Sequence, residues 1–187
     1  MIEAIRQMTA DMRAKVNLMV GRAILAAVSD AGPIQTAQAQ LLDDEVHDDI
    51  ERIQQYGFTS VPQAGAEAVI AFVGGNRDHG LIIAVDDRRY RLVGLAAGEV
   101  ALYDDQGQKV HLTRAGIVIN GSGKPVTIQN ASKVRMETAL LEVTGDIKDK
   151  CDAGGKTMAG MRTTYNSHTH NENNAAGGPT NAPNQGM

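Results

Sequence analysis

The second half of the chain is built from apolar segments that are too short to enclose a hydrophobic core. After Gly94, segments of two to four apolar residues alternate with turn residues such as Gly107, Gly116 and the pair Asn120-Gly121. The clearest segments are 110–112, 117–119, 126–128, 134–136 and 140–143. Their spacing of about seven to nine residues suits short stacked strands. Because one such chain can bury little apolar surface, stacking against copies of itself is expected, and the pattern indicates an obligate oligomer.

The distribution of glycine and aromatic residues supports the same interpretation. Of the 20 glycines, 13 lie in residues 94–187 and seven in residues 1–93. The chain has four Tyr, two Phe and no Trp, and only Tyr103 and Tyr165 lie beyond residue 90. Aromatic side chains bring the largest buried area per residue. A second half that nearly lacks them is therefore expected to be thin and turn-rich.

Residues 1–15 are expected to form a short helical arm, because apolar residues recur there at steps of three and four residues. The apolar positions are Ile2, Ile5, Met8, Met12 and the following Val16. The pattern leaves two interpretations open. The helix either packs on its own domain or serves as an arm that binds a partner.

Residues 16–95 have the pattern of a small β-barrel, with short apolar runs at 18–20, 23–28, 68–73 and 81–85. The clearest hairpin has its loop between Gly74 and Gly80, and Phe58 and Phe72 are expected in the core. An acidic cluster lies between two of these runs, at Asp43, Asp44, Glu45, Asp48, Asp49 and Glu51. Its spacing lacks the glycine and terminal glutamate of a calcium loop, so a solvated strand or loop face is expected.

Several classes of function are disfavoured by charge and hydropathy. With 18 Lys and Arg against 22 Asp and Glu, the net charge of −4 predicts no nucleic-acid partner. The longest apolar runs have six residues, whereas a membrane-spanning helix needs ~20. The N-terminus does not resemble a signal peptide, and the single Cys151 cannot form an intrachain disulfide, so folding in a reducing cytoplasm is expected. No grouping of acid, base and nucleophile suggests an enzyme.

The pair His168 and His170 is the one chemical motif of the polar C-terminal stretch 166–187. On an extended strand, residues two apart project to the same face, so the two imidazoles would lie side by side. Two imidazoles alone make an incomplete metal site, which leaves a chance pair in a polar tail as one interpretation. A metal-dependent hydrolase would need a third ligand and an open position. Three copies around an axis would instead supply six imidazoles, a closed octahedral set compatible with iron.

The chain also resembles a known family. The strings YGFTSVPQAGAEAVIAFVGGNRDHGLIIAVDDRRYRLVGLAAGEVALYDDQGQKVHLTRAGI and YNSHTHNENNAAGGPTNAPNQGM begin at Tyr56 and Tyr165. Together they are similar to the baseplate assembly protein V family of contractile-tailed phages, and most of all to its Mu-like central spike members. The resemblance extends from about Gly21 to the end of the chain.

This resemblance implies a non-enzymatic, homotrimeric, membrane-piercing spike in the tail baseplate of a virion, assembled in the host cytoplasm. The implied fold is mainly β: an OB-fold barrel at 16–95, an intertwined triple-stranded β-helix at 96–160 and a metal-containing apex at 161–187. His168 and His170 of each chain would hold one iron ion per trimer. Baseplate hub and tail tube proteins are the implied partners, and the host outer membrane is the implied target of piercing. The alternative is an oligomeric OB-fold protein that binds nucleic acid or carbohydrate.

Overall fold

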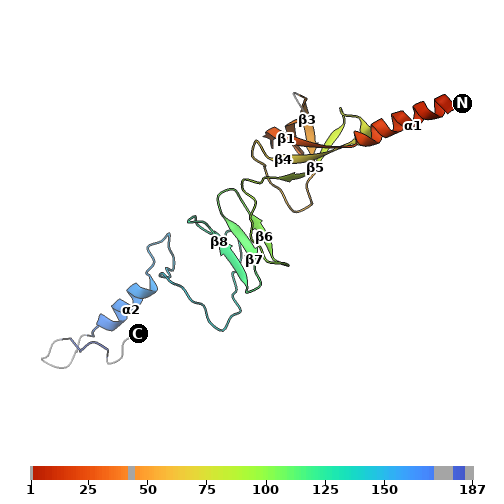
Figure 1. Ribbon diagram of the computed structural model, residues 1–187. Coiled ribbons are helices and arrows are strands. Elements are labelled where there is room, and N and C mark those ends of the chain that lie inside the picture. The colour runs from red at the N-terminus through yellow and green to blue at the C-terminus, as the bar shows by residue number, and fades with distance from the viewer. Residues whose placement is uncertain (1, 42–44, 171–178, 184–187) are drawn as a thin grey trace. The chain divides into compact units, whose positions relative to one another are not determined.

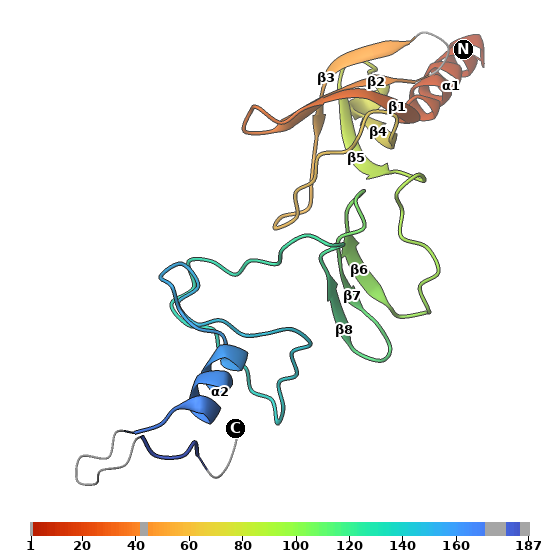
Figure 2. The same ribbon diagram turned by 90° about the vertical axis from the view of Figure 1, so that its left-hand side faces the viewer.

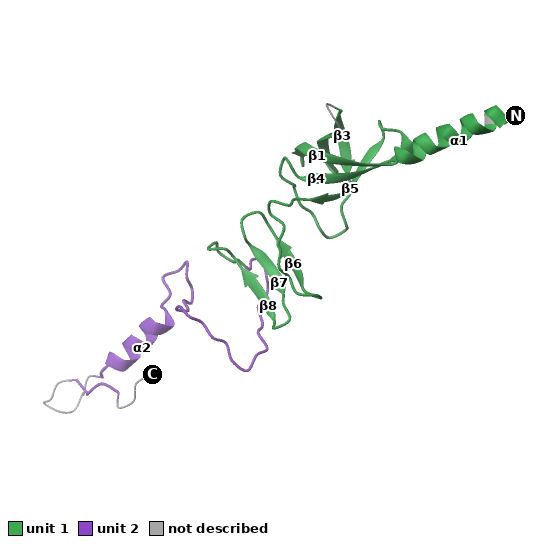
Figure 3. Cartoon of the chain, viewed as in Figure 1, with its two compact units in different colours: residues 1–127 green, residues 128–187 purple. Residues whose placement is uncertain are grey.

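The computed structural model describes residues 2–41, 45–170 and 179–183 (Figure 1). The chain divides into two compact units, Met1–Thr127 and Ile128–Met187, which Figure 3 distinguishes by colour. The first unit contains a helix, a closed barrel and a three-stranded sheet. The barrel strands are β1 (Val20–Ser29), β2 (Gln35–Gln40), β3 (Val46–Arg52), β4 (Glu67–Phe72) and β5 (Gly80–Asp86).

The barrel closes in the order β1-β2-β3-β5-β4, which is the arrangement of an OB-like barrel and confirms the expected β-fold of this region. The ten-residue strand β1 pairs with β4 over Val20–Ile24 and with β2 over Ile24–Ser29, so it belongs to both sides of the barrel. A β-bulge interrupts its pairing with β2 between Leu25 and Ala27, where extra twist allows the strand to curve. The parallel pair of β3 with β5 completes the closure at Glu51–Leu81 and Arg52–Ile82.

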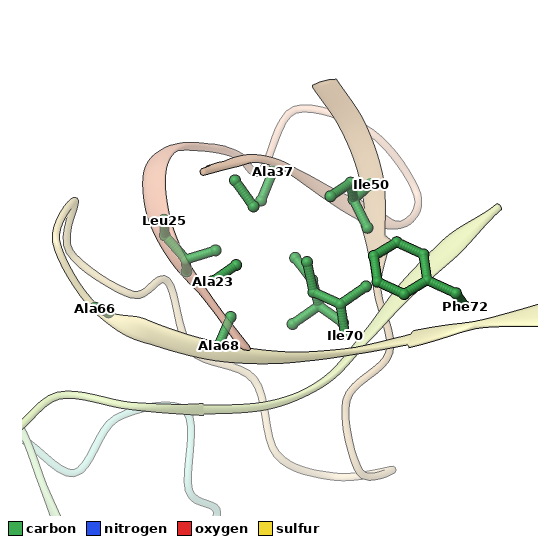
Figure 4. Packing of buried hydrophobic residues seen from close by; sticks show 10 residues of the cluster. Ala23, Leu25, Ala37, Ile50, Ala66, Ala68, Ile70 and Phe72 are labelled. Carbon is green, nitrogen blue, oxygen red and sulfur yellow. The ribbon is translucent and has the colours of Figure 1, made fainter. Parts of the chain in front are cut away.

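The barrel core is small because half of its buried hydrophobic residues are alanines. These alanines and the larger side chains around them are shown in Figure 4. The buried hydrophobic residues are Ala23, Leu25, Ala37, Ala39, Ile50, Ala66, Ala68, Ile70, Phe72 and Ile82. Strands β2 and β4 alternate buried and half-buried positions, as strands do when one face lines a barrel. The expectation for Phe72 is confirmed. The expectation for Phe58 is wrong: it is 62% exposed, because the chain leaves the barrel after β3.

The described part of the acidic cluster lies on or beside β3, as expected of a solvated strand face. Asp43 and Asp44 lie outside the described residues. Glu45 accepts hydrogen bonds from the Arg77 guanidinium, at 2.7 Å from Nε, and lies 2.8 Å from His47 Nε2. The hydrogen bond from Arg77 is the main cause that lowers the pKa of Glu45 to about 2, with a second contribution from His47. This acid is therefore paired with a neighbouring loop.

Helix α1 (Ile2–Asn17) leads into β1 at one end of the barrel (Figures 1 and 2). Its apolar positions are exposed, Ile5 by 58% and Met12 by 59%. The interpretation that the helix packs its apolar face on its own domain is therefore wrong. Only its C-terminal end is anchored, where Gly75 of the short helix η1 (Val73–Gly75) lies against the Lys15 carbonyl. This helix is an arm, since its apolar face finds no cover in the described part of its own chain.

Beyond the barrel, β6 (Val100–Tyr103), β7 (Lys109–Leu112) and β8 (Ile117–Asn120) form an antiparallel sheet. Two of the expected short segments are thereby confirmed as strands. In the described stretch 121–157 no further strand forms, and the residues pair only at the bridge Lys148–Thr157. Among described residues after Ile82, none is buried. No helix in the described part of the chain has the length and apolar character to cross a bilayer.

Candidate functional site

The C-terminal site begins with helix α2 (Met158–Ser167), an element that the sequence analysis did not anticipate. Thr157 caps it, because its side-chain oxygen accepts a hydrogen bond from the Gly160 N–H at 3.0 Å. Asp146 adds a second anchor by accepting from the Ala159 N–H at 3.2 Å. The hydrogen bond from Thr157 is the largest cause that lowers the pKa of Asp146. The helix start is thus fixed to the chain segment that precedes it.

The fragment Gly154 to Thr157 lies directly before α2. It resembles the end of a phosphate-binding loop only superficially. Gly155 packs so closely on the backbone that an added Cβ would lie 1.8 Å from the Asp149 carbonyl oxygen. Thr157 is used as the helix cap. Both residues therefore have structural roles in placing α2.

Helix α2 ends at Ser167, and the backbone becomes extended at His168, with φ −70° and ψ 145°. The structure brings the two histidines together as their spacing predicts. The ring centroids of His168 and His170 are 5.1 Å apart, and the ring planes are 83° apart. The ring centroid of Tyr165 lies 5.3 Å from that of His168. At the end of α2, His168 therefore contacts the rings of both Tyr165 and His170.

The hydrogen bonding of His168 suits a metal ligand. Its Nδ1 lies 2.6 Å from the Tyr165 carbonyl oxygen. Since a carbonyl only accepts, Nδ1 carries the proton and the Nε2 lone pair is left for another partner. Metal-bound histidines are usually oriented by a hydrogen bond of this kind from the second ring nitrogen. Tyr165 is a residue that the sequence analysis missed, because its place beside His168 depends on helix α2, which the sequence did not predict.

Thr180 is the second missed residue. Its N–H donates to the His170 carbonyl at 2.8 Å, and its hydroxyl accepts from the His170 N–H at 2.8 Å. The chain therefore returns to His170 after the segment 171–178, which lies outside the described residues. The flanking Pro179 and Pro183, which limit the backbone here, were the sequence signal for an ordered return.

One chain supplies too few ligands for a closed site. Among the described residues, no group of three or more His, Cys, Asp or Glu side chains is arranged to hold a metal ion. The two imidazoles are the right donors for iron or another transition metal, but a closed shell needs at least four. What the geometry provides is a pair of neighbouring imidazoles, positioned by α2 and by Thr180.

Three comparisons identify the family. A family model described as "Bacteriophage Mu Gp45, N-terminal" matches residues 22–89, which cover the barrel. The chain is 37% identical over 153 residues, 82% of its length and 77% of the relative's, to the baseplate puncturing device gp45 of Escherichia phage Mu. It is 36% identical over 162 residues, 87% of its length and 86% of the relative's, to the Mu-like prophage FluMu protein gp45 of Haemophilus influenzae. The expectation of a non-enzymatic protein is confirmed by this kinship with a baseplate component. The chain therefore belongs to the gp45 family of Mu-like baseplate spike proteins.

Proposed function

We propose that the protein is the homotrimeric central spike of a contractile tail, a needle that pierces the host outer membrane with an iron-stabilised tip. Membership of the family places the protein in the tail baseplate of a virion. The finer parts of the proposal are the trimer, the triple-stranded β-helix, the iron and the piercing.

The observation that carries the proposal is the apolar surface that a single chain leaves uncovered. Many large apolar side chains beyond the barrel are left uncovered: Leu102, Ile117, Ile119, Val126, Ile128, Val134, Met136, Leu140 and Leu141 are each more than half exposed. Obligate interfaces commonly bury 2,000–5,000 Å² or more, so a homotrimer can absorb this surface.

The backbone beyond β8 supports an intertwined shaft. The segments around Val126, Val134 and Leu140 are apolar, yet none pairs as a strand within the described part of its own chain. Unpaired backbone groups need partners when apolar side chains around them become buried. In a wound trimer, neighbouring chains supply both the strand partners and the apolar contacts. Interchain hydrogen bonds of this kind would also stiffen a needle that is pushed through a membrane.

The metal is assigned to the end of this shaft. His168 and His170 of three chains would hold one iron ion between them, and six imidazoles disfavour tetrahedral zinc. The ion would supply a cross-link between the three chain ends, not a reactive centre, because a closed shell of protein ligands has no position for substrate. Met158, Met161 and Tyr165 share one face of α2 by their spacing and are each about 40% exposed. Packing of these faces would support the same closure.

The proposal assigns opposite roles to the two ends of the chain. The barrel end would attach to the baseplate hub below the tail tube, and the His168 end would meet the outer membrane. Contraction of the sheath would supply the force. Passage through the membrane then requires a narrow shaft and a tip whose chain ends do not separate.

Light scattering combined with metal analysis of the purified protein tests the proposal. Three chains per particle with one iron per three chains is the expected result. A monomer, or one metal per chain, would overturn the spike assignment. Tight, salt-dependent binding to single-stranded DNA would favour the alternative of an oligomeric OB-fold binding protein.

A further inference from the structure

Helix α1 carries a heptad pattern whose apolar positions are not covered by the described part of its own chain. Core positions separated by alternating steps of three and four residues are Ile2, Ile5, Thr9, Met12 and Val16. The a and d positions of such a repeat form the seam of a coiled coil, and Met8 at position g extends the apolar face beside it. The four apolar members of the seam are each between 57% and 70% exposed. The helix thus has an uncovered seam with the period that helix–helix supercoiling requires.

We propose that three copies of α1 form a parallel coiled coil at the barrel end of the spike. This rests on the proposed homotrimer and adds a second trimerisation element, at the opposite end of the sequence from the metal. The occupant of the seam is the same helix of the other two chains.

The residues of the seam favour three strands. The first two core positions, a and d, are Ile2 and Ile5, and isoleucine at both positions shifts coiled coils from dimers towards trimers and tetramers. Thr9 is the one polar core residue, and its hydroxyl already donates within the helix, to the carbonyls of Ile5 and Arg6. Burying it in the seam therefore leaves no hydroxyl donor unsatisfied.

The flanking charges favour a parallel arrangement. Positions e are Arg6 and Arg13, and positions g are Met8 and Lys15; only Met8 has an e position of the following heptad, Arg13, within the helix. In a parallel coiled coil, g lies opposite e of the next helix, so Met8 meets the aliphatic stem of Arg13. In an antiparallel pair, e lies opposite e, and Arg6 would meet Arg13 as a like charge. The acids Glu3 and Asp11 lie at b and c, outside these contacts.

The barrel fixes where the helix ends and so favours the same direction in all three chains. Only Leu18 and Met19 separate α1 from β1. The Leu18 N–H bonds to the Ala14 carbonyl at 3.1 Å, and the Phe72 N–H of β4 bonds to the Met19 carbonyl at 2.8 Å. The sixteen-residue helix spans little more than two heptads, and a free helix of that length is marginal. Barrels held together by the shaft would supply the high local concentration that such a short coiled coil needs.

Cross-linking between chains of the full-length protein tests the proposal. Every variant also carries Cys151→Ser, because Cys151 is a free, exposed thiol that would react with the cross-linker. Met12→Cys places a thiol at core position d, and Gln7→Cys places one at the outer position f as the matched control. A short bismaleimide should yield about ten-fold more covalent dimer from Met12→Cys than from Gln7→Cys, because helices of one coiled coil are only 8–10 Å apart at the seam.

Light scattering of the same samples separates the two proposals. A trimer with selective cross-linking at position 12 is the expected result. A trimer in which Met12→Cys cross-links no better than Gln7→Cys would overturn the coiled coil and leave the spike intact, as would occur if α1 docks on a hub protein. A monomer would overturn both.

Discussion

His170 and Thr180 hold each other through two reciprocal hydrogen bonds, each 2.8 Å long, that join a backbone N–H to a carbonyl and a backbone N–H to a hydroxyl. One of the two proposed metal ligands is thus fixed at the backbone by a residue ten positions later in the chain. His168 is fixed differently, through its ring, by the Tyr165 carbonyl. The ligand pair is therefore oriented from both sides before any partner chain is added.

Thr180→Ala should weaken retention of the metal at the proposed tip. The substitution removes the acceptor of the His170 N–H, at a cost of about 1 kcal/mol, or roughly five-fold in an equilibrium. We expect iron to be lost to a chelator about five-fold more readily, as followed by metal analysis over time. Thr180→Ser keeps the hydroxyl and should restore retention. Equal retention in the Ala variant would mean that this contact does not hold the tip.

His168→Ala combined with His170→Ala should remove iron and leave the trimer largely intact. The apolar surface of the shaft lies elsewhere in the chain, so trimerisation is not expected to depend on the metal. Metal analysis and light scattering measure the two effects on one sample. His79→Ala is the matched control, because His79 is exposed in the β4–β5 hairpin and should change neither quantity. A monomeric double variant would show that the shaft is not the main trimerisation element.

Much of the fold could be predicted because local patterns determine it. The helix at the N-terminus, the hairpin with Gly74 and Gly80, and the strands around Val110 and Ile117 follow from periodicity and turn residues. The closure of the barrel also agrees with the strand spacing. Phe58 departs from the expectation for a physical reason: its apolar β-context predicts core, but the loop after β3 carries it away from the barrel.

The site was predicted less completely, because its supporting contacts join residues distant in sequence. The spacing of His168 and His170 was sufficient to place two imidazoles together. Helix α2 was missed because its sequence, with Gly160 and several Thr and Ser residues, has low helix propensity. Its Thr157 cap and the Asp146 anchor overcome that propensity. The return of Thr180 to His170 spans residues whose composition alone suggests disorder.

The stability of the barrel should fall in acid as the ion pair of Glu45 is lost. Its pKa is lowered from 4.5 to about 2, so the folded state binds this proton less readily than the unfolded state. The contribution is therefore fully present above pH 4.5 and disappears as the pH falls towards 2. Glu45→Gln should differ from the parent in melting temperature at neutral pH and converge with it in acid. A difference that does not depend on pH would exclude this ion pair as the cause.

Leu25→Ala should destabilise the barrel strongly, because Leu25 is fully buried in a core otherwise rich in alanine. Leucine-to-alanine changes in cores cost about 2–5 kcal/mol, and few large neighbours are available here to fill the space. Denaturant unfolding, followed by a spectroscopic signal that reports on the barrel, measures the loss in the free energy of unfolding. Ile24→Ala is the control. Ile24 is the residue before Leu25 and is 45% exposed, so truncating it leaves no enclosed cavity. Equal losses in both variants would contradict the assigned core.

The anchoring of α1 can be tested with two adjacent glycines that share the same backbone strain. Gly74 and Gly75 both have positive φ, 64° and 73°, so alanine at either should cost about 1 kcal/mol from the backbone alone. Only Gly75 approaches the helix: an added Cβ would lie 2.4 Å from the Lys15 carbonyl oxygen, whereas at Gly74 nothing lies within 4 Å. Gly75→Ala should therefore displace the end of α1 and speed hydrogen exchange of the Leu18 and Met19 amides by about ten-fold relative to Gly74→Ala. Similar exchange in the two variants would show that the helix is not held at this contact.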